Sequence, residues 1–198
     1  TSFADFLIGH VAAKVAQKTE QNIWNGAAAT NGEFGGFRET LLADGDVTDV
    51  GAGAAVTSAN VIAKIGLVVD AIGSSLYTSE DMYIYVSQNV ARAYVRALGG
   101  FATNIGAAGV NQDGTQWYTG GTLSFDGIKI AVANGLADNT MVAAEKSNLF
   151  FGTGLLSDQN EVKVIDMADI DGSQNVRVVM RFSAGIQHGI GSDIVLYS

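Results

Sequence analysis

Two histidines, His10 and His188, are the only imidazole side chains in this 198-residue sequence, which contains no cysteine. Thiol nucleophiles, thiolate metal sites and disulfides are therefore excluded together. His10 lies on a predicted helix near its apolar flank, and we interpret it as a structural residue. His188 lies at the end of a predicted strand. The Gly-x-Ser-x-Gly turn that presents a catalytic serine does not occur in the chain, so the sequence predicts no enzyme.

Two glycine-rich segments are candidates for binding a phosphate or a dinucleotide. Gly51–Val56 lacks the third glycine of a dinucleotide loop and follows no clear strand. Gly152-Thr-Gly154 lacks the Gly-Lys-Ser/Thr ending of a phosphate loop. We interpret both segments as ordinary loops and predict no cofactor.

Acidic clusters are the remaining candidates for a metal site. Asp169-Ile-Asp171-Gly172 is similar to part of a calcium loop, but Met167 and Val178 occupy the positions of its first and last carboxylate ligands. A second acidic group, Asp44, Asp46 and Asp49, lies in a predicted loop and is interpreted as a solvated surface. The sequence therefore predicts no metal.

Charge and composition narrow the choice of partners. The formal net charge is −9, and the eleven basic residues are scattered, which opposes sequence-specific binding to nucleic acid. No apolar run approaches the roughly 20 residues that span a bilayer, so we expect no membrane. There are 25 glycines and no proline, which favours pliable turns.

Helical periodicity marks three segments. Phe3–Trp24 places apolar residues at a spacing of four and is followed by Asn25-Gly26, a typical helix end. Thr57–Ser74 has an apolar face, with Thr57 or Ser58 as the expected N-cap. Gln88–Leu98 follows Ser87 as its expected cap. Between the first two helices, we expect residues 26–56 to form an extended loop with one or two short strands.

Strand patterns dominate the rest of the chain. We expect a hairpin from Thr115–Tyr118 to Thr122–Phe125 and a turn at Asp126-Gly127. Further expected strands are Met82–Val86, Ile128–Val132, Met141–Ala144 and Asn148–Phe151.

The last forty residues predict a long antiparallel arm. Apolar residues alternate along Glu161–Met167 and Asn175–Phe182, and the second run continues to Gly189. Asp171-Gly172 supplies a turn between them. Because a two-stranded ribbon is marginal alone in water, we expect either the first helix or a neighbouring molecule to support the arm.

The order of these elements resembles a known family across nearly the whole chain. The matching stretches, in family order, are Phe3–Trp24 with Asn25-Gly26, Gly35–Phe37, Ile84–Asn89 with Ala91, Tyr94 and Leu98, Phe125–Ile130, Asn148–Gly152, and Glu161–Tyr197 with Arg181-Phe182. They resemble the major capsid protein of tailed bacteriophages, with its Hong Kong ninety-seven type fold. Members of this family carry an N-terminal arm and an extended loop ahead of the first long helix, and we expect this sequence to lack both.

The resemblance implies an α+β fold with two domains. Residues 1–26 would form the spine helix of a peripheral domain, 27–152 a mixed α/β axial domain, and 153–198 the returning strands and long hairpin of the peripheral domain. Residues 101–118 would form a loop near the axis of the assembled ring.

The function that the resemblance implies is structural. The chain would assemble with copies of itself, and with other head proteins, into pentamers and hexamers of an icosahedral head that encloses viral DNA in the virion. We interpret five residues of the arm as candidate contacts between subunits: Asp169, Asp171, Gly172, Arg177 and Arg181. Two alternatives stay open, a shell of the encapsulin type that encloses enzymes and a monomeric strand-rich binding module.

Overall fold

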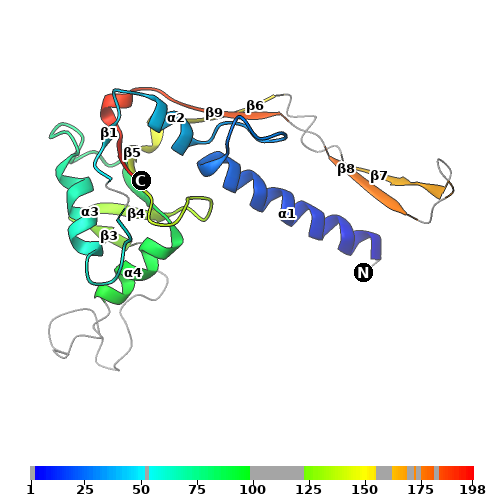
Figure 1. Ribbon diagram of the computed structural model, residues 1–198, viewed down its shortest axis with the longest axis horizontal. Coiled ribbons are helices and arrows are strands. Elements are labelled where there is room, and N and C mark those ends of the chain that lie inside the picture. Colours follow the sequence, from blue (N-terminus) through cyan, green and yellow to red (C-terminus); the bar gives the residue numbers. More distant parts are fainter. Residues whose placement is uncertain are drawn as a thin grey trace.

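The computed structural model describes residues 3–51, 54–98, 123–154, 162–168, 172, 175–180 and 183–198. Its centre is a six-stranded mixed sheet, from which a long helix and a strand ribbon extend in the same direction (Figure 1). No helix among the described residues is long and apolar enough to cross a membrane. The expected hairpin strand Thr115–Tyr118 and the loop 101–118 lie outside the described residues.

The sheet has the strand order β1-β10-β5-β2-β4-β3. Two of its pairs are parallel, β1 with β10 and β2 with β4, and the other three are antiparallel. Its strands are β1 (Thr48–Asp49), β2 (Met82–Val86), β3 (Leu123–Phe125), β4 (Ile128–Val132), β5 (Met141–Glu145) and β10 (Val195–Tyr197).

Both faces of this sheet are covered. Helices α3 (Val61–Asp70) and α4 (Gln88–Leu98) lie on one face, and the opposite face packs against α2 (Phe37–Ala43) and the end of α1 (Phe3–Asn25). Strand β5 shows the period of two directly, because Met141 and Ala143 belong to the first cluster and Val142 and Ala144 to the second. Coverage on both sides explains why the first four residues of β5, Met141–Ala144, are all apolar rather than alternating.

Most of the predicted helices and central strands are confirmed. Helix α1 spans 23 residues, and α4 and β2 have the predicted bounds. Strands β3 and β4 meet at Asp126 and Gly127, whose φ angles are 48° and 84°. Positive φ at both positions is the geometry of a two-residue hairpin turn, so the turn predicted at Asp126-Gly127 is confirmed.

Three local predictions are wrong. The segment 26–56 contains helix α2, which is held by burial of Phe37 and Leu41 one turn apart. Helix α3 begins at Val61, and Asn60 takes the N-cap position expected of Thr57 or Ser58. Gly152 lies inside a strand rather than in a loop.

The predicted arm consists of two separate ladders. Strands β7 (Val162–Asp166) and β8 (Val176–Met180) pair antiparallel, with Val164 opposite Val178. Strand β9 (Ala184–His188) instead pairs with β6 (Leu149–Thr153), and we call this pair the β6–β9 ribbon. Figure 1 shows the ribbon leaving the sheet and β7–β8 lying farther out. The short 3-10 turns Lys146–Asn148 and Gly191–Asp193 lie at the sheet end of the ribbon.

Candidate assembly surface

The C-terminal end of α1 is fixed to the central sheet. The Trp24 ring lies between Phe37 and Tyr85, with ring centroids 5.4 Å and 5.1 Å away. The backbone N–H of Asn134 donates to Glu20 Oε1 at 3.1 Å. Gly135 approaches so closely that an added Cβ would lie 2.2 Å from the Glu20 carbonyl oxygen. The helix therefore leaves the sheet in a direction set by several contacts at one end.

The opposite half of α1 carries apolar side chains that the described part of the chain covers only in part. Leu7, Val11 and Val15 are half-buried, and Phe6 is 66% exposed. The Phe6 ring stacks on His10 at a centroid distance of 6.3 Å, so His10 is an exposed neighbour of an exposed aromatic. A half-covered apolar stripe on a projecting helix is suited to contact with another molecule.

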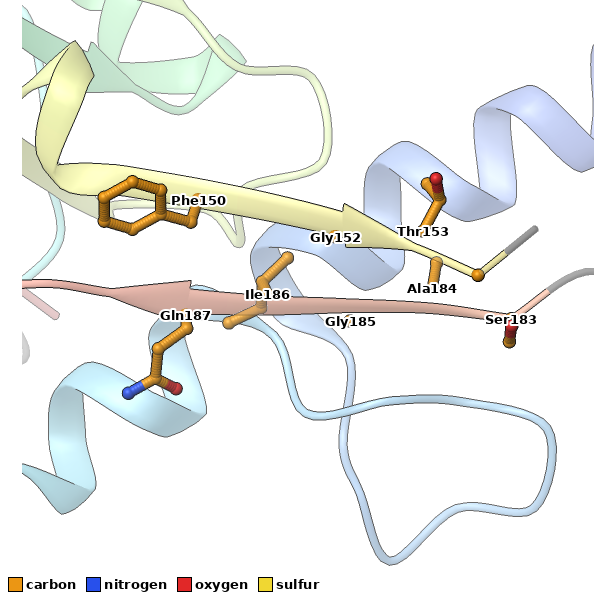
Figure 2. Close-up of a pocket in the computed structure, with 9 residues that line it drawn as sticks. Phe150, Gly152, Thr153, Ser183, Ala184, Gly185, Ile186 and Gln187 are labelled. Carbon is orange, nitrogen blue, oxygen red and sulfur yellow. The ribbon is translucent and has the colours of Figure 1, made fainter. Parts of the chain in front are cut away.

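The β6–β9 ribbon has one face toward the molecule and one face outward. Leu149 and Ile186, on the inner face, pack against the cluster that contains Trp24. On the outer face, Phe150 is 55% exposed. An open groove of about 410 Å³ runs along the ribbon. Figure 2 shows Phe150 and Gln187 at one end of the groove, Ser183 at the other, and Gly152 and Gly185 between them.

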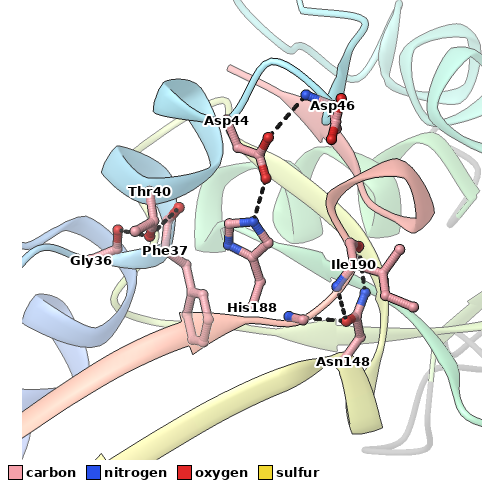
Figure 3. Close-up of polar contacts among 9 residues, drawn as sticks. Gly36, Phe37, Thr40, Asp44, Asp46, Asn148, His188 and Ile190 are labelled. Carbon is pink, nitrogen blue, oxygen red and sulfur yellow. Dashed lines mark hydrogen bonds and ion pairs between the residues drawn. The ribbon is translucent and has the colours of Figure 1, made fainter.

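The root of the ribbon is held by the buried side chain of Asn148. Its Oδ1 accepts hydrogen bonds from the backbone N–H groups of Gly189 and Ile190 at 3.1 Å and 2.8 Å. Its Nδ2 donates to the Ile190 carbonyl at 2.8 Å (Figure 3). One amide side chain thus fixes the point at which β9 turns back toward the sheet.

His188 lies beside this root and forms a hydrogen bond with Asp44. Its Nε2 lies 2.7 Å from Asp44 Oδ2, and His188 is only 7% exposed (Figure 3). Because a carboxylate can only accept, Nε2 is the protonated nitrogen. The buried Nδ1 has no hydrogen-bond partner among the described residues. The backbone N–H of Asp46 and the hydrogen bond with His188 lower the pKa of Asp44.

The Asp44 pairing corrects the prediction of a solvated acidic loop. Asp44 joins the end of α2 to the end of β9, while Asp46 is exposed. Asp49 accepts the backbone N–H of Gly51 at 2.8 Å. The sequence gives no local signal for the pair, because 144 positions separate the two residues. Among the described residues, no group of three or more acidic or histidine side chains could hold a metal ion.

Of the five predicted contact residues, the structure describes Gly172 and Arg177. Arg177 is exposed on β8, opposite Ile165. Gly172 has a φ of 72°, as expected of a turn glycine. Asp169, Asp171 and Arg181 lie outside the described residues. The Asp44–His188 pair lies elsewhere, at the ends of α2 and β9. The sequence did not predict this pair.

No protein-family model and no curated protein sequence matches this chain. Solved structures do match. A structure from Mycobacterium phage Che8 is 14% identical with a TM-score of 0.62 and covers 99% of this chain. The satellite phage P4 procapsid, including its size determination (Sid) protein, is 7% identical with a TM-score of 0.65 and covers the whole chain. The capsid of an empty GTA particle is 13% identical with a TM-score of 0.58 and covers 98%.

These likenesses show the fold. The chain has the α+β Hong Kong ninety-seven type fold that the resemblance predicted, with a mixed sheet and small two-stranded ladders. It spans 63%, 67% and 65% of the three matched chains, or about two thirds of their length.

Proposed function

We propose that this chain is a structural subunit of a phage-type head, which assembles with copies of itself into pentamers and hexamers around DNA. One observation carries the proposal: the likeness to a procapsid and a capsid extends over the whole chain or nearly all of it. A match of that extent includes the projecting helix and ribbon, which a shared central sheet alone would not explain.

The projecting elements support the proposal physically. Helix α1 and the β6–β9 ribbon leave the sheet in the same direction (Figure 1) and expose Phe6 and Phe150. A monomer gains nothing from extended elements with exposed apolar side chains, because the hydrophobic effect favours covering them. Neighbouring subunits would cover them.

We further propose the division into a peripheral domain, residues 1–26 and 153–198, and an axial domain, residues 27–152. One strand qualifies this division. Because β10 pairs with β5 and β1, we assign residues 195–197 to the axial sheet. Asp169, Asp171, Gly172, Arg177 and Arg181 stay our candidates for contacts between peripheral domains, since Arg177 is exposed on the outermost ladder.

The mass of the full-length protein in solution tests the proposal. We expect sedimentation velocity to resolve capsomers or closed shells, and negative-stain images to show particles with icosahedral outlines. A protein that stays monomeric at all concentrations would contradict the proposal and favour a binding module. Particles purified from cells distinguish the two shell functions, because a head contains nuclease-protected DNA and an enzyme compartment contains protein cargo.

A further inference from the structure

Two glycines lie directly opposite each other in the β6–β9 ribbon, one pair in from its outer end. The register pairs Gly152 of β6 with Gly185 of β9. Glycine weakens a strand, because it loses the most conformational freedom on folding and offers no side chain to pack. Two opposed glycines therefore weaken the two-stranded ribbon at a single position, where a ribbon has few other contacts to stabilise it.

The fold of the chain itself does not require these glycines. Neither has a φ in the left-handed region. A Cβ added at Gly185 would meet no atom within 4 Å, and one added at Gly152 would lie 3.9 Å from the Gly185 carbonyl oxygen, an ordinary contact. Gly135 differs, because its added Cβ would collide with Glu20. The described part of the chain thus leaves open space over the glycine pair that its side chains do not fill.

The residues around this space indicate which kind of surface covers it. Phe150 lies on the same face as Gly152, since residues two apart in a strand point the same way. Neither β6 nor β9 contains Lys, Arg, Asp or Glu, although the chain as a whole carries a net charge of −9. Two copies of an acidic chain repel each other least where they meet through uncharged surfaces.

We propose that the outer face of the β6–β9 ribbon is a contact between two copies of this chain, in which an apolar side chain of one copy covers Gly152 and Gly185 of the other. This inference rests on the proposed function and assigns one of its surfaces. The exposed Phe150 ring and the open glycine pair lie side by side on a single patch, which makes the patch self-complementary, as a two-fold contact between identical chains requires. Phe150 of the second copy is the side chain that fits.

Valine substitution at the two glycines tests the contact in the full-length protein. Gly152→Val and Gly185→Val introduce a residue favoured in strands, so we expect the unassembled chain to be at least as stable as wild type. The added side chains fill the space over the ribbon, and we expect the concentration needed for assembly to rise roughly tenfold or more. Phe150→Ala should weaken assembly in the same direction.

The matched control is Gly66→Ala in α3. An added Cβ there also meets nothing within 4 Å, but the position lies on a helix of the central part. We expect it to leave assembly unchanged. Analytical ultracentrifugation over a concentration series measures all four variants against wild type.

A photo-crosslinking amino acid in place of Phe150 gives an independent reading that does not depend on the valine variants folding. We expect covalent dimers of the chain on illumination of assembled protein. Assembly by the valine variants at wild-type concentration, or assembled protein without such dimers, would overturn this contact and leave the shell proposal intact. A wild-type protein that never assembles would overturn both.

Discussion

At the scale of single residues, the Asp44–His188 pair is a contact that the sequence alone does not predict. Neither residue belongs to a recognisable motif, and the pairing depends on α2 bringing Asp44 to the end of β9. The sequence predicted the helix stop at Asn25-Gly26 and the turn at Asp126-Gly127, because both depend on neighbouring residues. It could not predict a contact that forms only when distant elements have packed.

Replacement of Asp44 tests how much this pair contributes to the stability of the fold. In Asp44→Ala, His188 stays buried with neither ring nitrogen paired to another residue among those described, so we expect the free energy of unfolding to fall by about 1–3 kcal/mol. Asp46→Ala is the control, because Asp46 is exposed and its backbone N–H is retained; it should change stability by no more than about 0.5 kcal/mol. Urea denaturation measures both, and equal losses would contradict a specific role for Asp44.

The raised pKa of Tyr85 predicts that the folded state loses stability at alkaline pH. Burial, with smaller contributions from Asp81 and Tyr83, raises the pKa of Tyr85 from 10.0 to about 12. A folded pKa above the unfolded value means that the folded state holds its proton more tightly, so this stabilisation is complete below pH 10 and is lost as the pH rises toward 12.

The measurement is the melting temperature of wild type and Tyr85→Phe from pH 7 to pH 12. Phenylalanine keeps the ring packed against Trp24 but has no proton to lose, so its alkaline decline should be shallower than that of wild type. Identical alkaline declines would show that Tyr85 does not titrate in this way. The difference in melting temperature between the two proteins at pH 7, where Tyr85 keeps its proton, gives the effect of removing the hydroxyl group alone.

At the scale of elements, periodicity predicted those that are long or strongly patterned. Helix α1, β2 and α4 were predicted from their own residues. Helix α2 was missed because seven residues are too few to show a helical period, and a helix so short is stable only through tertiary packing of Phe37 and Leu41. The ribbon was also beyond prediction, since the alternation in β9 does not say that β6 is its partner.

The anchor of α1 depends on Gly135. A methyl group there would collide with the backbone of Glu20, so we expect Gly135→Ala to destabilise the fold by about 1–3 kcal/mol through overpacking. Gly9→Ala, within α1 itself, meets nothing within 4 Å and should stabilise the helix by about 0.5–1 kcal/mol. Thermal unfolding compares the two. A Gly135→Ala protein as stable as wild type would mean that the 133–138 loop does not hold the helix.

At the scale of the whole molecule, charge predicts how assembly responds to salt. Each copy carries a formal charge of −9, so copies repel one another at long range, and this repulsion is screened within about 10 Å at 0.1 M salt. We expect the concentration needed for assembly to fall as sodium chloride rises from about 0.05 M to about 0.5 M. Light scattering across a salt series measures this concentration. Dissociation of particles by salt would indicate that attractive ion pairs between subunits dominate instead.

The position of β10 in the sheet has a consequence for how each copy reaches its native state. Strand β10 lies between β5 and β1, with Val195 opposite both Ala143 and Thr48. A nascent chain that has emerged through β9 still lacks the strand that joins β1 to the sheet, and one edge of β5 is unpaired. Such late, non-local pairing slows folding and leaves an edge open to aggregation. Pairing of β10 is therefore the step that completes the sheet, and we expect a chain truncated before Val195 to aggregate rather than to assemble.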